Sequence, residues 1–400
     1  MMDGFYVAWR YLIYNWGRSL TLVACVTLIA VLPLALELLL NESQRQLLNR
    51  AETTPLVVGA KGSSLDLVMN SLYFGDTVPE TISMAAVDRV ADSDLALPIP
   101  LYVRFKARGF PIVGTNLDYF ELRGLKIAEG RALALLGECV LGARVAEELG
   151  LKAGDSLLSS PETLFDLAGV YPLKMRVAGV LVPTHSADDL AVFVDLKTAW
   201  VIQGLVHGHE DLMKVTDPTL VMGRSDGNVT ATPKLVQYTE ITSENIGSFH
   251  FHGDPADYPI TAAIALPHDA KSGAILRGRY VGGGSDPRRA PETQQILVPG
   301  EVIEGLLANI FRIKNVLDAV ILVVGTATGL ALILVFALSL RLRQREIRTI
   351  FKLGCSRSTI ARLLGAEIAI ILAAAATLTG LLLAVVAHFD EPLVRALFIR

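Results

Sequence analysis

Residues 341–362 read RLRQREIRTIFKLGCSRSTIAR and separate two uncharged apolar runs, residues 319–340 and 368–387. The segment holds seven Lys or Arg residues and a single acid, Glu346. Each apolar run has about twenty residues, the length that a helix needs to cross roughly 30 Å of hydrocarbon. Because basic residues beside membrane spans stay on the cytoplasmic side, we expect this short segment to face the cytoplasm.

The composition agrees with a membrane protein that also carries a large polar domain. The chain has 400 residues, of which 52% are hydrophobic, and its mean hydropathy is +0.46. These values are too apolar for an ordinary soluble protein and too polar for one made mostly of spans. The net charge of −4 implies no polyanionic partner, so no nucleic acid is expected. The three cysteines predict no intrachain disulfide.

A third apolar run covers residues 20–40 and contains one charged residue, Glu37. We interpret this run as a retained anchor, because its core is longer than that of a signal peptide and no small-residue cleavage site follows. Arg10 and Arg18 precede it and keep the N-terminus inside. Glu37 lies near the outer end, where its carboxylate can reach the lipid headgroups.

The sequence therefore predicts an α+β membrane protein with three transmembrane helices and a large extracytoplasmic domain between the first and second. Roughly 275 residues separate these two spans, which is enough for one large or two small domains. In chain order the predicted segments are an N-terminal amphipathic helix (1–18), a transmembrane helix (19–40), a stalk helix (41–53), an extracytoplasmic core domain (54–297), a second stalk helix (298–318), a second transmembrane helix (319–340), a cytoplasmic loop (341–363), a third transmembrane helix (364–387) and an extracytoplasmic C-terminal tail (388–400).

The middle region mixes short strands and helices. Apolar and β-branched runs bounded by turn residues predict strands at residues 56–60, 95–105, 110–116, 175–183, 191–196, 219–223, 235–241 and 258–267. Helical periodicity predicts an amphipathic helix that ends at Gly150 and another over residues 197–205.

The first residues are rich in aromatic side chains. Phe5, Trp9, Tyr11, Tyr14 and Trp16 lie close together beside two arginines. At helical spacing this pattern is typical of an amphipathic helix on the inner membrane surface. An aromatic belt on a longer first helix is the alternative.

The basic segment has an internal order. Residues 341–352 favour a helix, Gly354 breaks it, and Ser356 or Ser358 can cap the helix that follows. Four apolar residues lie among its cations, namely Ile347, Ile350, Phe351 and Leu353. Such a surface suits insertion into a groove of a cytosolic partner, whereas the simpler interpretation is a solvated helix whose arginines only set the topology.

Four histidines form two H-x-H pairs on the predicted outer side, His207 with His209 and His250 with His252. Alternate residues of a strand point to the same face, so each pair can present two imidazoles to one metal ion. Asp211 or Asp254 would complete the ligands, and zinc suits imidazole with carboxylate. The alternative is a pair of polar loops whose histidines contact water or backbone.

The chain offers no nucleotide site of its own. The nearest sequence, GAKGSS at residues 59–64, lacks the GxxxxGK[ST] spacing and would lie outside the cell. No catalytic constellation is apparent either, so we predict that the protein is not an enzyme and that any ATP and magnesium are bound by a separate subunit.

Several segments resemble one family. REIRTIFKLGCSRSTIARLLGAE (345–367) resembles the REIG-ILRALGAS-R-I---LLEA signature of permeases of the macrolide-exporter (MacB) and cell-division (FtsX) type, which are the mechanotransmission subunits of ABC systems. GTNLDYFELRGLKIAEGR (114–131) resembles their GT-PDYF-VRGL-L-EGR run, and ECVLGARVAEELGLKAGD (138–155) their EVVLG--VA--LGLKVGD run. VAGVLVPTHSADDLAVFVDL (177–196) resembles their V-GVL-PTGS--D-AVFV-L run.

The resemblance implies that residues 54–297 form a MacB-like periplasmic core domain in a bacterial inner-membrane protein. It implies a cytosolic ABC ATPase as partner, a homodimer, and a periplasmic binding protein or lipoprotein as a further partner. The positions that would couple to the ATPase are Glu346, Arg348, Lys352, Gly354 and Arg357. The family has four spans where this sequence predicts three, because residues 388–400 are too short to cross and carry charges at both ends. Three interpretations stay open: the chain is truncated, this branch of the family ends outside, or a short C-terminal helix lies on the outer surface. They bear on the dimer contact that a fourth span makes.

The sequence is compatible with two functions. The first is an ABC permease subunit that uses ATP hydrolysed by a separate protein to handle cargo on the outer side of the membrane. The second is a transmembrane regulator of FtsX type that activates an extracytoplasmic partner without moving cargo. The sequence does not distinguish metal, haem, peptide, lipid and lipoprotein as cargo.

Overall fold

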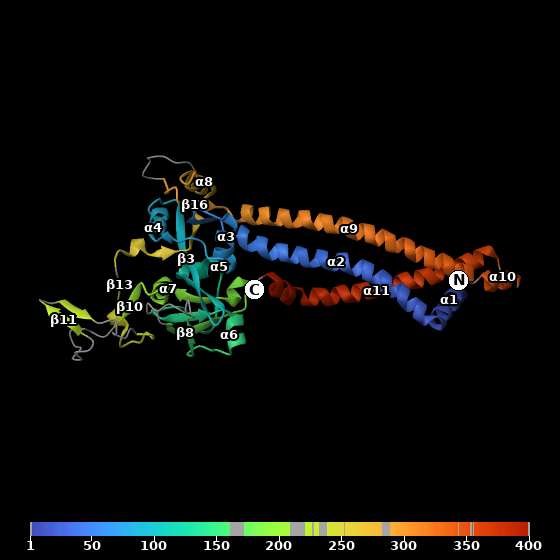
Figure 1. Cartoon of the computed structure of the whole chain (residues 1–400), viewed down its shortest axis with the longest axis horizontal. Coiled ribbons are helices and arrows are strands. Elements are labelled where there is room, and N and C mark those ends of the chain that lie inside the picture. The colour runs from blue at the N-terminus through green and yellow to red at the C-terminus, as the bar shows by residue number, and fades with distance from the viewer. Residues whose placement is uncertain are drawn as a thin grey trace. The chain divides into compact units, whose positions relative to one another are not determined.

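The structure is a computed structural model that describes residues 2–160, 172–208, 221–225, 228–231, 238–251, 253–281, 289–342, 344–352, 354 and 356–398 (Figure 1). The chain divides into two compact units. A helical unit consists of Met1–Leu47 and Gly305–Arg400, and an α/β unit consists of Leu48–Glu304. The chain passes from one unit to the other within two long helices, α2 (Trp16–Glu52) and α9 (Pro299–Leu342).

The helical unit contains α1 (Met2–Tyr14), α10 (Gln344–Lys352), α11 (Arg357–Phe398) and most of α2 and α9. Two of its stretches, Trp16–Leu39 in α2 and Ser358–Ala387 in α11, are long and apolar enough to cross a membrane. The third predicted span, residues 319–340, is helical within α9, but the described residues do not establish it as a span.

Both ends of the chain differ in detail from the predicted segments. The predicted helix of residues 1–18 is divided at Asn15, and the aromatic side chains at its start, Phe5 and Trp9 among them, are exposed. At the other end α11 continues to Phe398, so most of the predicted tail, residues 388–400, extends the preceding helix. Polar residues alone do not end a helix, because their cost in propensity is below about 1 kcal/mol per residue.

Both apolar and polar contacts join the helices of this unit. Helix α1 packs against α11, and Ala8 of α1 is fully buried. The hydroxyl of Thr27 in α2 donates to the carbonyl of Ala375 in α11 over 3.5 Å. The ammonium of Lys314 in α9 lies 3.9 Å from a carboxylate oxygen of Glu37 in α2. Glu37, which the sequence directs toward lipid headgroups, thus has a cationic neighbour within the protein.

The α/β unit is built on a mixed sheet of ten strands. Neighbouring strands follow the order β16-β1-β15-β3-β4-β9-β6-β8-β5, and β7 pairs with β8. The pairs β4·β9 and β6·β8 are parallel, and the other pairs are antiparallel. The strands are β1 (Leu56–Ala60), β3 (Ala96–Ala107), β4 (Phe110–Thr115), β5 (Ile127–Gly130), β6 (Glu138–Leu141), β7 (Ser156–Leu158), β8 (Lys174–Leu181), β9 (Val192–Asp195), β15 (Ala262–Pro267) and β16 (Gln294–Leu297).

Helices and short ribbons complete this unit. The helices are α3 (Ser64–Tyr73), α4 (Ala85–Ala91), α5 (Leu117–Arg123), α6 (Ala143–Leu149), α7 (Leu196–Gln203) and α8 (Ala270–Gly278), with 3-10 turns η1 (Ala187–Leu190), η2 (Ile246–Ser248) and η3 (Pro255–Asp257). The ribbons pair β2 (Ile82–Ser83) with β14 (Pro259–Ile260), β10 (Val206–Gly208) with β13 (Phe249–Phe251), and β11 (Val221–Ser225) with β12 (Asn228–Ala231).

The predicted strands are confirmed in the middle of the sheet. Residues 110–116 contain β4 and residues 191–196 contain β9. Ile112–Thr115 of β4 and Val192–Val194 of β9 are buried, which explains their apolar runs. The predicted strand at 235–241 is wrong in its described part, 238–241. There Glu240 makes only an isolated bridge to Lys174.

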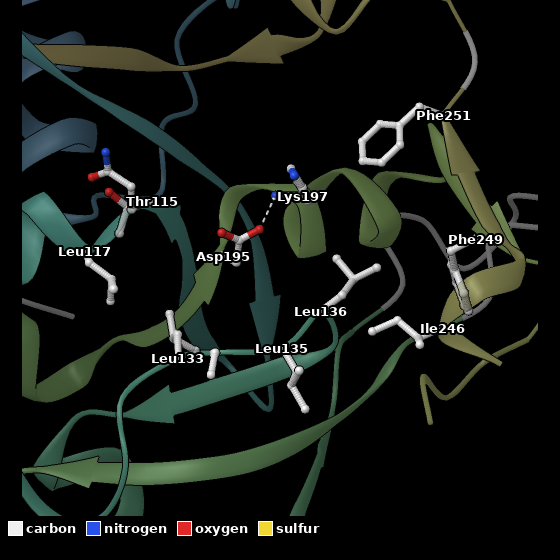
Figure 2. Close-up of a pocket in the computed structure, with 12 residues that line it drawn as sticks. Thr115, Leu117, Leu133, Leu135, Leu136, Asp195, Lys197, Ile246, Phe249 and Phe251 are labelled. Atoms are coloured by element: carbon white, nitrogen blue, oxygen red, sulfur yellow. Dashed lines mark hydrogen bonds between the residues drawn. The ribbon is translucent and has the colours of Figure 1, made fainter. Parts of the chain in front are cut away.

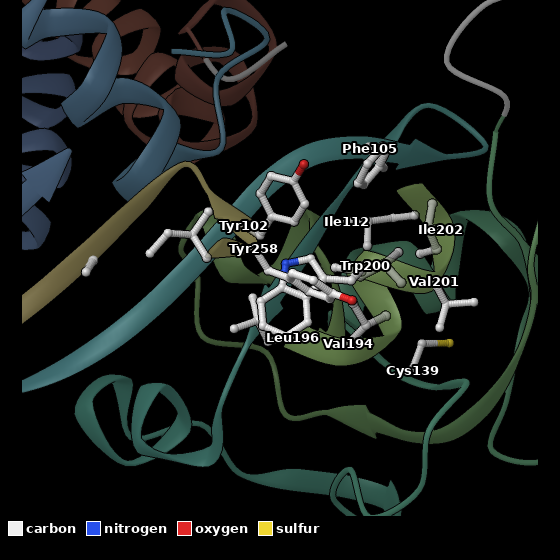
Figure 3. Close-up of a cluster of buried hydrophobic side chains, with 14 of the residues drawn as sticks. Tyr102, Phe105, Ile112, Cys139, Val194, Leu196, Trp200, Val201, Ile202 and Tyr258 are labelled. Carbon is white, nitrogen blue, oxygen red and sulfur yellow. The ribbon is translucent and has the colours of Figure 1, made fainter. Parts of the chain in front are cut away.

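Helix α7 covers the core of the sheet (Figure 3). The carboxylate of Asp195 caps its first turn by accepting from the amide of Lys197 over 3.0 Å. The indole of Trp200 packs edge-on against Tyr258, with ring centroids 4.9 Å apart, and donates to the carbonyl of Pro259 over 2.8 Å. Because the indole N–H has a partner, the large ring is buried without an unpaired polar group.

Gly142 joins strand β6 to helix α6 at a point of close backbone approach. A Cβ atom at this position would lie 2.3 Å from the carbonyl oxygen of Asp188 and 2.4 Å from that of Asp189. Both oxygens belong to the backbone of η1, so neither can move aside as a side chain would. The LG sequence at residues 141–142 therefore permits η1 to lie against the end of β6.

We expect Gly142→Ala to lower the free energy of unfolding by about 1–3 kcal/mol, because the added methyl group must displace the backbone of η1. The matched control is Gly247→Ala, whose Cβ would meet no atom within 4 Å. Thermal unfolding of the purified chain measures both variants. Equal melting temperatures for the two would contradict this assignment of the close approach.

Candidate functional site: the basic loop and the buried end of α2

The basic segment forms a helix, a sharp turn and the start of a second helix. Helix α10 ends at Lys352, and the amide of Gly354 donates to the carbonyl of Phe351 over 3.1 Å. Gly354 has φ +98°, a conformation that glycine adopts without strain. The hydroxyl of Ser356 then accepts from the amide of Thr359 over 3.2 Å and caps α11. The predicted break and cap are confirmed.

The described side chains of this segment face outward. Arg348 and Lys352 are exposed and lie four residues apart, so they share one face of α10. Phe351 beside them is 50% exposed. Of the other predicted coupling positions, Glu346 lies on α10 and Arg357 begins α11, but their side chains fall outside the described part of the chain. The result is an exposed basic helix with an apolar residue on its surface.

A buried ion pair fixes the end of α2 within the α/β unit. Arg50, in the last turn of α2, donates from both terminal nitrogens to the carboxylate of Asp188, over 2.6 Å and 2.8 Å. It also donates to the hydroxyl of Tyr119 over 2.7 Å, and its Nε donates to the carbonyl of Leu72. The side chains of Arg50 and Asp188 are only 8% and 2% exposed. The guanidinium is thus satisfied on three sides by protein groups.

A short turn presents Asp188 to Arg50. The hydroxyl of Ser186 donates to Asp188 over 3.0 Å, and Tyr119 donates to it over 2.8 Å. The neighbouring Asp189 accepts from the backbone amides of Thr184 and His185, each over 2.8 Å. His185 has φ +54°, where the family run PTGS has a glycine. Asp189 therefore stabilises a turn that places Asp188 under the end of α2.

A second arginine contacts the same helix end. Arg123, at the end of α5, donates to the hydroxyls of Thr53 and Thr54 over 3.3 Å and 2.8 Å. Its guanidinium carbon lies 5.7 Å from the centre of the Tyr119 ring. Cations near a helix C-terminus are favoured because the last carbonyls carry partial negative charge. Arg50 and Arg123 together therefore hold the last turn of α2.

The pKa shifts follow from this geometry. Burial alone would lower the pKa of Arg50 and raise that of Asp188, but their attraction and hydrogen bonds outweigh it and shift both the opposite way. Burial raises the pKa of Tyr119, and that of Tyr73 to about 12. Burial and the charge of Arg50 lower the pKa of Arg123. At neutral pH the cluster holds two arginine cations and one carboxylate, with both tyrosines neutral.

The sequence did not point to this cluster. Tyr119 and Arg123 fall within the family run at residues 114–131, and Asp188 within the run at 177–196, so the family resemblance marks their segments but not these residues. Arg50 and Asp188 are 138 residues apart, and no local spacing links them. The one signal in the sequence is Arg50 itself, an arginine near the end of the predicted stalk helix at residues 41–53.

The predicted metal residues are partly described. His207 and His250 lie opposite each other in the register of β10 and β13, whereas His209, His252 and Asp211 lie outside the described residues. Within the described part of the chain, no three candidate ligands come together. A zinc site at the two H-x-H pairs stays a prediction.

A cavity of about 500 Å³ opens beside the ends of β4 and β9 (Figure 2). Figure 2 shows Leu133 and Leu135 on one side of it, and Phe249 and Phe251 across from them. Asp195 and Asn116 supply polar groups to the lining, and the side-chain oxygen of Asn116 has no hydrogen-bond partner. The cavity can therefore hold a ligand that has an apolar group beside a hydrogen-bond donor, and the side-chain oxygen of Asn116 would accept that hydrogen bond.

Glu138 organises one wall of this cavity. Its carboxylate accepts from the Arg131 guanidinium over 2.8 Å and from the amides of Ala134 and Leu135 over 3.3 Å and 3.1 Å. Burial alone would raise the pKa of Glu138, but these hydrogen bonds outweigh it and lower the pKa. The buried carboxylate therefore fixes the loop that carries Leu133 and Leu135.

Comparison with known proteins identifies the class. Residues 23–232, more than half of the chain, match the family described as MacB-like periplasmic core domain. The chain therefore belongs to this family, as expected of a permease of the MacB/FtsX type. The resemblance stated from the sequence is confirmed. Family membership and the two apolar helices indicate a membrane protein with an extracytoplasmic domain. No curated protein matches the chain.

Two solved structures are similar to the chain at low identity. The periplasmic region of MacB from Actinobacillus actinomycetemcomitans is 11% identical, with 66% of this chain and 98% of that chain covered and a TM-score of 0.33. The extracellular domain of the noncanonic ABC-type transporter YknZ from Gram-positive bacteria is 12% identical, with 60% and 98% covered and a TM-score of 0.32.

We expect Asp188→Asn to lower the free energy of unfolding at pH 7 by about 3–5 kcal/mol, because it leaves the buried Arg50 cation without its anion. The folded pKa of Asp188 lies below the unfolded value of about 3.9, so its contribution is complete above that pH and disappears as the pH falls through the folded pKa. The difference in melting temperature between the two proteins, measured from pH 7 to pH 2, should therefore be constant above about pH 5 and become smaller below about pH 4. A constant difference across this range would contradict the assignment.

Proposed function

We propose that this chain is the membrane subunit of an ABC transporter in which a separate cytosolic ATPase drives movement of the extracytoplasmic α/β unit. The observation that carries the proposal is the exposed basic helix α10, which stands directly between α9 and α11. Family membership adds that such permeases work with an ABC ATPase. ATP and magnesium would be bound by that ATPase.

The orientation follows from the charges. Residues 341–363 are cytoplasmic in this proposal because arginines and lysines beside spans stay inside. Residues 41–318 are then extracytoplasmic, and residues 19–40, 319–340 and 364–387 cross the membrane. The inner membrane of a bacterium is the proposed location.

Coupling would use the outward face of α10. Arg348 and Lys352 share that face, and Phe351 adds an apolar group to it, which is the composition of a helix that binds in a groove. By family resemblance Glu346 and Arg357 belong to the same contact. Gly354 lies at the bend between α10 and α11 and has a positive φ. Because a glycine can change its backbone angles at little steric cost, α10 would be able to tilt relative to α11.

The described stretches Trp16–Leu39 and Ser358–Ala387 have few charges, so we propose that cargo is handled on the outer side and does not pass between them. A homodimer and a periplasmic or lipoprotein partner complete the proposal. A regulator of FtsX type would share the coupling helix but would activate an outer enzyme. ATP hydrolysis that rises with added cargo supports the transporter, whereas activation of an outer hydrolase without cargo movement supports the regulator.

We expect the double variant Arg348→Glu with Lys352→Glu to lose at least tenfold of the ATPase activity that co-purifies with the tagged chain. Reversing two charges at one helix face costs more than the 1.4 kcal/mol that corresponds to tenfold in binding. The matched control is Lys126→Glu with Lys152→Glu, which reverses two exposed charges of the α/β unit. Vanadate-sensitive hydrolysis of Mg-ATP in detergent measures the activity.

The control variant should retain the activity of the unaltered chain. Equal activity in both double variants would contradict the proposed contact. Absence of any co-purifying ATPase from the unaltered chain would contradict the proposed function as a whole.

A further inference from the structure

We propose that the Arg50 cluster is the joint through which movement of α2 is transmitted to the central sheet of the α/β unit. The proposal rests on the proposed function, in which an ATPase moves the helices. It assigns to Arg50 a positioning role for that movement. The cluster consists of Arg50, Thr53 and Thr54 of the α2 end, Tyr119 and Arg123 of α5, Asp188 of η1, and the Leu72 carbonyl of α3.

The cluster joins α2 to elements that continue directly into the sheet. Helix α5 begins two residues after β4 ends at Thr115, and η1 ends two residues before β9 begins at Val192. Strands β4 and β9 are parallel neighbours in the middle of the sheet, with Thr115 opposite Asp195. A displacement of Arg50 would therefore act on two adjacent central strands through connections of one residue each.

The third connection passes through β6. The carbonyls of η1 lie so close to Gly142 that no Cβ fits between them, and Gly142 directly follows β6. Strand β6 is the other neighbour of β9. Asp188 is thus held between its partner Arg50 and a backbone contact that leads to β6, and it cannot shift without moving this contact.

The chemistry of the cluster resists sliding. A guanidinium that donates two hydrogen bonds to one carboxylate has a fixed orientation, whereas the hydrophobic attraction between apolar side chains is non-directional. Arg123 adds a second attachment to Thr53 and Thr54. Because the pair is buried, water cannot replace either partner during movement.

The start of α9 differs from the end of α2. Its described ion pair, between Arg277 and Glu301, spans 3.5 Å, and the two side chains are 48% and 64% exposed. Exposed ion pairs of this kind contribute little to stability. Ile303 supplies a fully buried apolar contact instead. The two helices therefore enter the α/β unit through attachments of different kinds, and the fixed one belongs to α2.

The test uses the tagged chain with its co-purified ATPase and compares amide hydrogen exchange with and without Mg-ATP. The variant is Arg50→Met with Asp188→Asn, which removes both charges together and so avoids leaving one buried ion unpaired. The control is Lys174→Met with Glu240→Gln, which removes both charges of another ion pair of the same unit, outside the Arg50 cluster and its three connections. Should the first variant fail to fold, Arg50→Lys keeps the charge and removes the two-pronged contact.

In the unaltered complex we expect ATP to change the exchange of residues 117–123 and 187–195. The Arg50 variants should keep ATP hydrolysis and lose this ATP-dependent change, whereas the control should keep both. A purely structural role would raise exchange equally with and without ATP and would leave the difference intact.

The outcomes separate the two proposals. If the ATP-dependent change has the same size in the unaltered complex and in the Arg50 variants, the proposed role of the Arg50 cluster is wrong, and the proposed function still holds. A complex that binds no ATPase, or shows no ATP-dependent change before any substitution, overturns both.

Discussion

The buried guanidinium of Arg50 is the constraint on which the α/β unit depends. An arginine removed from water must have its hydrogen bonds and its charge satisfied by protein, and here Asp188, Tyr119 and the Leu72 carbonyl do so. These partners come from three elements that are distant in sequence. Helix α3, the turn η1 before β9 and helix α5 after β4 must therefore be in place together around the end of α2.

The family segments gain a physical meaning from this arrangement. The runs at residues 114–131, 138–155 and 177–196 supply β5, β6, β8 and β9, which are consecutive in the order β9-β6-β8-β5, and α5, which follows β4. Glycine at 142 permits the close approach of η1, and Asp189 shapes the turn that carries Asp188. The segments that resemble the family are thus the half of the sheet on which α2 is fixed.

Local structure could be predicted from the sequence because its causes are local. The buried strands β4 and β9, the break at Gly354 and the cap at Ser356 each follow from a few neighbouring residues. The Arg50–Asp188 pair and the Glu37–Lys314 contact could not be predicted, because each depends on which distant elements the fold brings together. The tail at residues 388–400 is too short and too charged to cross a membrane, and its sequence alone does not decide whether it is helical, whereas in the structure α11 continues to Phe398.

The proposed coupling requires the basic loop to lie in the cytoplasm while the α/β unit lies outside. Cys355 lies within that loop, Cys139 is fully buried, and a Cys25→Ala, Lys152→Cys variant would place one thiol in each location. Labelling intact cells with a membrane-impermeant maleimide tests the arrangement directly. We expect immediate reaction at position 152, and reaction of Cys355 only after the membrane is opened. Labelling of Cys355 in intact cells would contradict it.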